Sequence, residues 1–396
     1  MPIPKRDERQ AVLQSKRDRK MARSTHAYVR GNTVKFYEWL AESPAVKRVP
    51  QGPAIWICGD CHLGNLGPID DGTGRIEVQI RDLDQAVIGN PAHDLIRLGL
   101  SLATAARGSD LPGVTTARMI EAMVDGYAKA MVDPASRDAG PEPDAVRSVK
   151  RRATGRKWKH LAKERLDSSD PVIPLGDKFW PLEADERATL AQVLAAPDVS
   201  NLILSLDHKD RDRAVRMVDA AYWMKGCSSL GLLRFAALVG LKNAKGRSDY
   251  ALLDMKEAVD PIAPASPGAI MPADPAERVV AAARALAPNL GDRMVAAKAF
   301  GRSLFIRELS PQDLKLEVDQ FSNGQAVTAS HYLAFVVGKA HARQMDDTTR
   351  RDWADVLEAD RRDVIDAPTW LWESIVSLSG SHEAGYLDHC RRYALT

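Results

Sequence analysis

The sequence predicts an α+β protein with two lobes, and three observations lead to this prediction. Four short apolar runs rich in β-branched residues, at 54–58, 75–80, 235–241 and 250–256, indicate strands. Apolar residues at helical spacing occupy much of the remaining chain. The chain has 396 residues, which is long enough for two lobes with a sizeable core.

The composition of the chain excludes several classes of function. Hydrophobic residues make up 45% and charged residues 27%, and the net charge of +2 gives no reason to expect a nucleic-acid partner. The chain has no run of about 18 apolar residues, and its charged start, MPIPKRDERQ, is not a secretory signal. Four cysteines in so long a chain are typical of a reducing compartment. We therefore expect a cytoplasmic protein without a membrane partner.

Helices are expected on both sides of a central stretch at 54–95. Charge and apolar spacing favour helices at 5–21, 32–42, 95–106, 115–133, 184–195, 276–286 and 328–344, and more from 351 to 395. A loop rich in Pro and Gly is expected at 134–143, and strands within 294–309. The basic segment at 147–165 is read as a helix that is solvated or contacts an anionic substrate, with RNA as the alternative.

The central stretch carries three polar residues in otherwise apolar or turn-forming sequence. Asp60 and Asn65 follow the first predicted strand in a glycine-rich turn, and Asp82 follows the second strand. A strand–loop–strand hairpin would bring the three side chains to one rim. This pattern suits magnesium-dependent phosphoryl transfer, in which one carboxylate orients the attacking hydroxyl and oxygen ligands hold the metal. The alternative is that Asp60 and Asn65 only form turns.

The same stretch resembles a known catalytic loop. The sequence GDCHLGN at 59–65 is similar to the H-G-D-x-H-x-x-N loop of aminoglycoside-phosphotransferase-like and choline-kinase-like enzymes, and 82–95 resembles the metal-binding segment that follows it. More narrowly, the chain resembles DUF2252, a bacterial family of unknown function grouped with the protein-kinase-like fold. In that family a G-D-x-H-x-x-N-x-G loop precedes an acidic D-x-D turn. Cys58 departs from the pattern, since many relatives carry His there.

This resemblance implies a role for each polar residue. Asp60 would be the catalytic base, Asn65 and Asp82 the Mg²⁺ ligands, and Asp84 a further carboxylate near the metal. The remaining residues that it implies are His62, as a structural part of the loop, Asp94, as an anchor beneath it, and Arg30. Arg30 lies in an aromatic-x-Arg-Gly sequence and would reach a phosphate or form a structural ion pair.

A second signal lies at 221–258. A glycine turn at 226–231 precedes the predicted strand at 235–241, and a Lys/Gly/Ser turn at 242–248 precedes the strand that ends with Lys256. Backbone N–H groups of a glycine turn can approach phosphate oxygens, and a strand Lys reaches them as a point charge. The stretch resembles the kinase-like nucleotide loop, with MKEA in the place of V-A-I-K. An ordinary hairpin with an exposed Lys is the alternative.

The nucleotide-binding candidates follow from this second resemblance. Glu277 is the only acidic residue within the predicted helix at 276–286, so it is the candidate partner of the strand Lys, although a helix dipole also favours an acid there. The candidates are Gly226, Ser228, Ser229, Gly231, Lys256 and Glu277.

The order of the two signals is reversed relative to kinase-like enzymes. In those enzymes the glycine loop and Lys come first, and a helix with L-A-x-x-H-A, which 328–344 resembles, precedes the catalytic loop. The resemblances together imply a two-lobed, circularly permuted protein-kinase-like fold, which is acceptable where the original termini lie close together. The expected organisation is a helical segment at 1–53, a catalytic-loop and helical lobe at 54–200, a β-rich nucleotide lobe at 201–320, and completing helices at 321–396.

The function that these signals imply is transfer of phosphate from ATP, with Mg²⁺, to a hydroxyl of an unidentified small molecule. Nucleotidyl transfer of AMP on the same fold and a non-catalytic ATP-binding regulator are alternatives. A third alternative is a metal hydrolase that uses Asp60, His62, Asp82, Asp84 and His93. Cys58 and Cys61 form a C-x-x-C, but a zinc site would need a second pair, which Cys227 and Cys390 do not provide.

Overall fold

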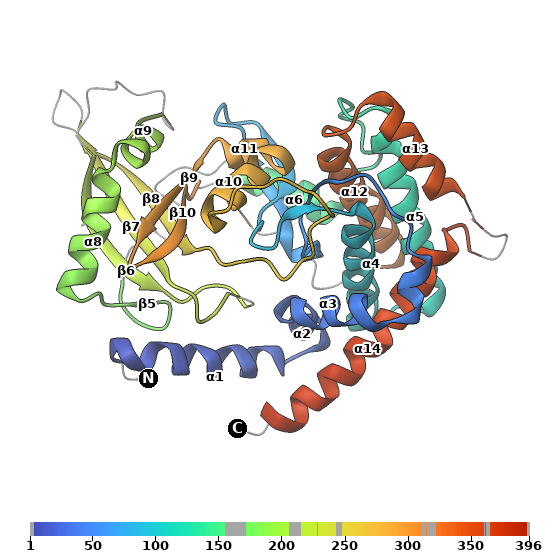
Figure 1. The fold of residues 1–396 in the computed structure, drawn as a ribbon, viewed down its shortest axis with the longest axis horizontal. Coiled ribbons are helices and arrows are strands. Elements are labelled where there is room, and N and C mark those ends of the chain that lie inside the picture. Colours follow the sequence, from blue (N-terminus) through green and yellow to red (C-terminus); the bar gives the residue numbers. More distant parts are fainter. Residues whose placement is uncertain are drawn as a thin grey trace.

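A computed structural model of the chain describes residues 4–154, 172–205, 215–227, 229–242, 248–310, 314, 322–359, 361 and 365–393. It shows a mixed α/β fold in which the largest sheet lies at one end and the long helices at the other (Figure 1). Part of the predicted basic helix, most of the 242–248 turn and Ser228 lie outside the described residues. No helix in the described part of the chain is long and apolar enough to cross a membrane.

The largest sheet has six antiparallel strands. Their spatial order is β5 (Phe179–Trp180), β6 (Val215–Trp223), β7 (Arg234–Lys242), β8 (Ser248–Glu257), β10 (Arg302–Glu308) and β9 (Met294–Ala299). The predicted strands at 235–241 and 250–256 form β7 and β8, and the strands expected within 294–309 form β9 and β10. The sequence prediction missed β6, whose first half carries charged residues that interrupt the apolar pattern.

The two faces of this sheet have different neighbours. One face packs its apolar side chains against α8 (Ala184–Ala195), α9 (Pro197–Ser205) and Leu13 of α1 (Arg9–Met21). The opposite face carries charged residues near one end: Arg234 on β7 is paired with Lys256 on β8, and Asp254 lies two residues before Lys256. Side chains two residues apart on a strand share a face, so these three lie on the same side of the sheet.

Two small hairpins form the central stretch. β1 (Ile55–Ile57) pairs with β4 (Val87–Gly89), and β2 (Leu66–Asp70) pairs with β3 (Ile76–Ile80). The prediction that the first strand pairs with the strand at 75–80 is therefore wrong. The tight turn at 71–75 joins β2 to β3 instead. The sequence prediction missed β2 because Gly67 and Pro68 interrupt its apolar run.

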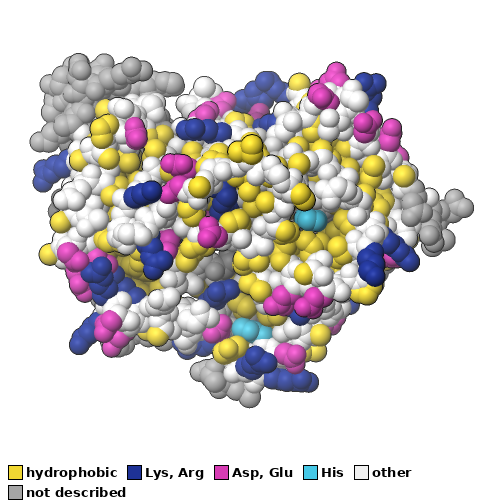
Figure 2. All heavy atoms as spheres, in the orientation of Figure 1, with side chains coloured by type: hydrophobic (Ala, Val, Ile, Leu, Met, Phe, Trp, Pro, Cys, Tyr) yellow, Lys and Arg dark blue, Asp and Glu magenta, His cyan; other side chains and the backbone are white. Residues whose placement is uncertain are grey.

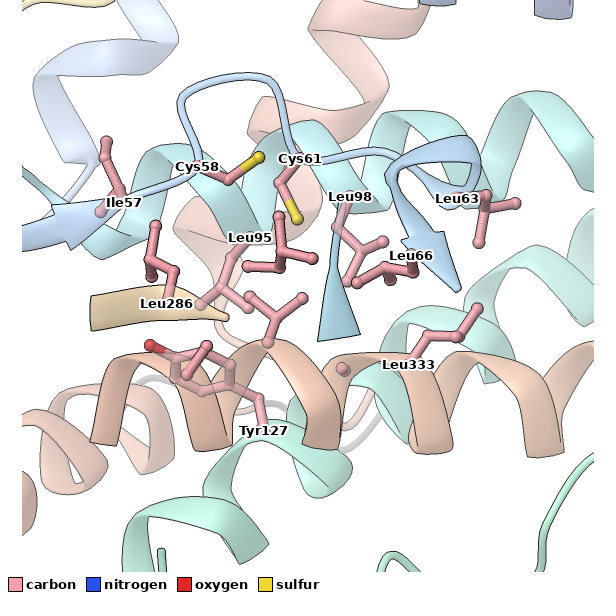
Figure 3. Packing of buried hydrophobic residues seen from close by; sticks show 14 of the residues in the cluster. Ile57, Cys58, Cys61, Leu63, Leu66, Leu95, Leu98, Tyr127, Leu286 and Leu333 are labelled. Carbon is pink, nitrogen blue, oxygen red and sulfur yellow. The ribbon is translucent and has the colours of Figure 1, made fainter. Parts of the chain in front are cut away.

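The long helices enclose the main core beneath this stretch. They include α4 (Pro91–Gly108), α5 (Gly113–Val132), α12 (Asn323–Ala342), α13 (Asp347–Glu358) and α14 (Thr369–Tyr393). Leu95 and Leu98 of α4 lie between the 59–65 loop and the side chains of Tyr127 and Leu333, which come from α5 and α12 (Figure 3). The loop thus rests on close-packed apolar side chains, which limits its movement.

The remaining helices surround these parts. They are α2 (Thr25–Gly31), α3 (Thr33–Glu42), α6 (Asp144–Thr154), α10 (Pro275–Leu286) and the single turn α11 (Pro288–Gly291). In Figure 1, α1 runs below the sheet toward α2 and α3, so the start of the chain lies alongside both ends of the molecule. Basic and acidic side chains are interspersed over the face in Figure 2, in keeping with the small net charge.

Candidate functional site

A cavity of about 320 Å³ lies where the central stretch, the large sheet and α1 meet. Asp60, Asn65, Asp82 and Asp84 line it, as does the turn at 229–232. Helix α1 contributes Gln10, Gln14 and Arg17. The two segments that carry the sequence signals, separated by more than a hundred residues, thus contribute to one concave surface.

Lys256 links the sheet to the central stretch directly. Its side chain is almost completely buried, and its Nζ lies 3.4 Å from Asp82 Oδ1 and also contacts Asp84 Oδ2. Glu277, the predicted partner, lies exposed in the first turn of α10. The assignment of Glu277 as partner therefore needs correction: within the described residues Lys256 pairs with Asp82 and Asp84. The acid in the first helical turn is explained by the helix dipole.

The two aspartates respond oppositely to this shared environment. Burial opposes ionisation of Asp82, but the positive charge of Lys256, with those of Arg307 and Arg234, holds its pKa below the usual range. Burial and the neighbouring charge of Asp82 raise the pKa of Asp84 above its usual range, against the effect of Lys256. Asp82 therefore loses its proton at a lower pH than Asp84.

A buried ion cluster lies on the same face of the sheet as Lys256. Asp254 is fully buried and accepts hydrogen bonds from Arg234 at 2.8 Å and from Arg307 at 3.2 Å. Arg307 also donates to the backbone carbonyl of Arg81, next to Asp82. The cluster thus connects three elements of the sheet and the central stretch, and each buried charge has a partner, as burial of ions requires.

Asp60 is held by two donors. Arg97 Nε donates to its Oδ1 at 2.8 Å and the Thr33 hydroxyl donates to its Oδ2 at 2.9 Å. Burial raises the pKa of Asp60, an effect that Arg97 and Thr33 oppose. His62 Nε2 lies 3.8 Å from Asp60 Oδ2, and burial together with the charges of Arg30 and Arg97 lowers the pKa of His62 well below its usual value. His62 is therefore a neutral neighbour of Asp60.

Asn65 faces the cavity with its amide oriented. Its Nδ2 donates to the backbone carbonyl of Asp60 at 2.8 Å. Because Nδ2 is bound to the loop backbone, the amide oxygen Oδ1 is the atom of this side chain that can accept a bond or bind a metal at the cavity. The backbone of Asn65 also accepts from the N–H of Arg81 at 2.7 Å, which brings the residue before Asp82 beside the loop.

Asp94 lies beneath the 59–65 loop. Its carboxylate accepts from the backbone N–H groups of Cys58 at 2.7 Å and Gly59 at 2.9 Å, and it lies 3.1 Å from His341 Nε2. His341 Nδ1 in turn is 2.8 Å from the hydroxyl of Tyr127. All of these side chains are buried, so the network connects the start of the loop to α4, α5 and α12.

Backbone conformation and a close backbone neighbour require glycine at position 59, and the surroundings of Gly64 show where Arg30 lies. Gly59 has a φ of +73°, and a Cβ there would lie 2.1 Å from the backbone oxygen of Gln85. A Cβ at Gly64 would lie 2.6 Å from the Arg30 guanidinium carbon. Arg30 therefore packs over the loop, close enough to His62 to affect its pKa.

The glycine turn is shaped by positive φ angles of 107° at Gly226 and 106° at Gly231. Ser229 and Gly231 line the cavity, and the carbonyl of Gly226 accepts from Lys20 Nζ at 2.7 Å. Ser228, the remaining residue predicted in this turn, lies outside the described residues.

Sequence reasoning missed three residues that position the site. Arg97 and His341 were read as parts of core helices, although His341 lies in the segment whose x-H-A pattern was noted. Arg278 of α10 is buried and donates to the backbone carbonyls of Asp84 at 2.8 Å and Ala86. Arg97 and Arg278 each lie among apolar residues of a helix. A charged residue in such a position was the sequence signal that could have identified them as residues that position the site.

The metal-hydrolase alternative has no assembled ligand set. No group of three or more His, Cys, Asp or Glu side chains is placed to hold a metal ion anywhere in the described ranges, which include all five residues of that alternative. Cys58 and Cys61 are both buried and free. The hydrogen bond with Cys61 and burial raise the thiol pKa of Cys58, and burial raises that of Cys61 against the effect of the same hydrogen bond. Raised thiol pKa values disfavour both metal ligation and redox reactivity.

Comparison with known proteins decides the family. The DUF2252 profile, described as an uncharacterized protein conserved in bacteria, matches residues 9–392. This chain belongs to the DUF2252 family. The match includes both signals, from the 59–65 loop to Lys256, so the residues around the cavity all lie within the DUF2252 region. Neither the curated proteins nor the solved structures give a match to this chain.

The geometry of Gly59 leads to a prediction with a matched control. Gly59→Ala should destabilise the protein by about 2 kcal/mol more than Gly72→Ala, measured by urea unfolding. Both glycines have positive φ angles, so both substitutions incur similar backbone strain, but nothing lies within 4 Å of a Cβ at Gly72. Equal destabilisation by the two variants would contradict the close contact between the loop and Gln85.

Proposed function

We propose that this protein is an ATP- and Mg²⁺-dependent phosphotransferase that acts on a hydroxyl group of a small molecule, on a circularly permuted protein-kinase-like fold. One observation carries the proposal. Lys256, from the second signal, contacts Asp82 and Asp84, from the first, beside a cavity that Asp60 and Asn65 also line. Two motifs that each resemble part of a kinase-like site thus contribute to one site despite their reversed order in the chain.

The oxygen atoms at the cavity fit a magnesium ion. Mg²⁺ prefers oxygen ligands and keeps several waters and phosphate oxygens, so one or two protein ligands suffice. Asn65 Oδ1 and the ionised carboxylate of Asp82 would be these ligands, with Asp84 beside them. Lys256 and the backbone of the 229–231 turn would bind the ATP phosphates, and bound Mg²⁺–ATP would supply the phosphoryl group.

Asp60 would orient the acceptor hydroxyl. Each carboxylate oxygen can accept more than one hydrogen bond, so Asp60 can accept from a hydroxyl while Arg97 and Thr33 keep it in place. Catalysis would come mainly from this positioning and from the charges around the transferred group, as is general for phosphoryl transfer.

A thermal-shift titration tests the nucleotide site. ATP with Mg²⁺ at about 100 times Kd should stabilise the wild-type protein by about 2.7 kcal/mol, a rise of a few degrees in Tm. The rise should be lost in Asp82→Ala and Lys256→Met, each compared with its own ligand-free Tm. Lys298→Met is the control, because Lys298 is a largely exposed lysine on β9 of the same sheet. A rise in all three variants would contradict the proposal. So would the absence of any rise in the wild-type protein with ATP and Mg²⁺ when Zn²⁺ or Mn²⁺ alone stabilises it.

Product analysis tests the reaction. We expect ADP and a phosphorylated acceptor when the protein is incubated with ATP, Mg²⁺ and a mixture of hydroxyl-bearing metabolites, followed by mass spectrometry. Asp60→Asn should reduce turnover at least about a hundredfold, because the hydroxyl loses its proton acceptor, while the ATP-dependent thermal shift remains. A gain in mass equal to AMP would instead identify nucleotidyl transfer. Nucleotide binding with no turnover of any acceptor would identify a regulator.

A further inference from the structure

A second cavity, of about 220 Å³, lies apart from the candidate site and has a different lining. It lies between β3 and α12, with contributions from α6, α10 and the 134–143 loop. The first cavity and this one share no lining residue. Nothing in the proposed phosphotransferase reaction uses it.

The charge around this cavity is strongly unbalanced. Five basic side chains and one acidic side chain line it: Arg75, Arg137, Lys150, Lys339, Arg343 and Glu77. Arg75 pairs with Glu77 at 2.9 Å, and Lys150 pairs with Glu142 at 2.6 Å. Among the residues that the structure describes, Arg137, Lys339 and Arg343 form no ion pair with an acidic side chain. The charge of Glu77 acts on Lys339 and Arg343 as well as on Arg75, so one carboxylate faces several cations and positive charge remains in excess for an anion.

These cations are close enough to affect one another. Burial lowers the pKa of Lys339, and the charge of Glu77 opposes this effect. The smaller effects of the charges of Arg343, Arg137 and Arg75 lower the pKa further. An anion between them would remove this repulsion. Arginine side chains are suited to phosphate in particular, since the guanidinium forms paired hydrogen bonds to its oxygens.

The wall of the cavity supplies two further features. Ile76, Val78, Leu286, Phe335 and Val336 make part of it apolar. Gln79, which also lines it, is only 5% exposed, and its Oε1 has no hydrogen-bond partner within the described part of the chain. A buried amide oxygen without a partner costs free energy, so a donor such as a ligand hydroxyl would satisfy it.

We propose that this second cavity binds a small phosphate monoester with a hydroxyl-bearing carbon body, such as a phosphorylated polyol. Arg137, Lys339 and Arg343 bind the phosphate, the amide of Gln79 accepts from a hydroxyl, and the apolar wall contacts the carbon atoms. A concave cavity with a partly apolar lining and a few polar groups is typical of small-molecule sites. The cavity volume of about 220 Å³ corresponds to a handful of water molecules, at about 30 Å³ each. A small phosphate monoester fits this space, and a polymer does not.

Isothermal titration calorimetry of the full chain with glycerol 3-phosphate and with ribose 5-phosphate tests the proposal. At least one should bind the wild-type protein, and Lys339→Gln and Arg137→Gln should each weaken that binding at least about tenfold, because each removes a charged donor. Arg152→Gln, an exposed arginine on α6 that does not line the cavity, is the charge-matched control and should leave the affinity unchanged.

Lys256→Met separates the two cavities. Binding that survives Lys256→Met and is weakened by Lys339→Gln supports the second cavity, whatever the outcome for ATP. Loss of binding in Lys256→Met alone would place the phosphate ester in the first cavity and overturn the proposal. Absence of binding by both esters, equal weakening by Arg152→Gln, or equal affinity for inorganic phosphate and the esters would also overturn it.

Discussion

The contact of Lys256 with Asp82 and Asp84 is the interaction on which the rest of the candidate site depends. It joins β8 of the large sheet to the stretch that follows β3, and so brings the 59–65 loop and the glycine turn to the same cavity. Buried charges are costly to desolvate, and removing one partner leaves the other uncompensated. The Asp254 cluster with Arg234 and Arg307 lies on the same face of the sheet and supplies further pairing where these charges are concentrated.

The 59–65 loop is held from below by a different kind of interaction. Asp94 binds two backbone N–H groups at its start, and His341 and Tyr127 extend this network into the helical core. The apolar side chains around Leu95 and Leu98 pack beneath it. The loop therefore presents Asp60 and Asn65 from a rigid support, which is what positioning a reacting hydroxyl and a metal ion requires.

Local sequence patterns predicted much of this arrangement and failed where long-range contacts decide. The helix at 184–195 and the strands that became β7 and β8 were predicted from local sequence, and the structure confirms them. The pairing of β1 with β4 was not predictable, because pairing depends on which strands the intervening turns allow to meet. Likewise, the carboxylate that meets Lys256 is set by how the sheet packs on the central stretch, so a local pattern pointed to Glu277 instead.

The residues that position the candidate site were hidden for a related reason. Arg97 lies in an otherwise apolar helix, where its charge has meaning only once Asp60 is known to be beside it. Arg278 is in the same situation, since two of its acceptors, the carbonyls of Asp84 and Ala86, lie almost two hundred residues earlier in the chain. Motif spacing predicted the candidate catalytic and metal-binding side chains. The side chains that position them became visible only in the tertiary structure.

A crystal structure with a non-hydrolysable ATP analogue and Mn²⁺ in place of Mg²⁺ would test the central claim most directly, because the anomalous signal of Mn²⁺ locates the metal independently of the nucleotide. The account predicts Mn²⁺ bound to Asn65 Oδ1 and a carboxylate oxygen of Asp82, with Lys256 Nζ on the phosphates. Nucleotide or Mn²⁺ located away from these three residues would contradict it.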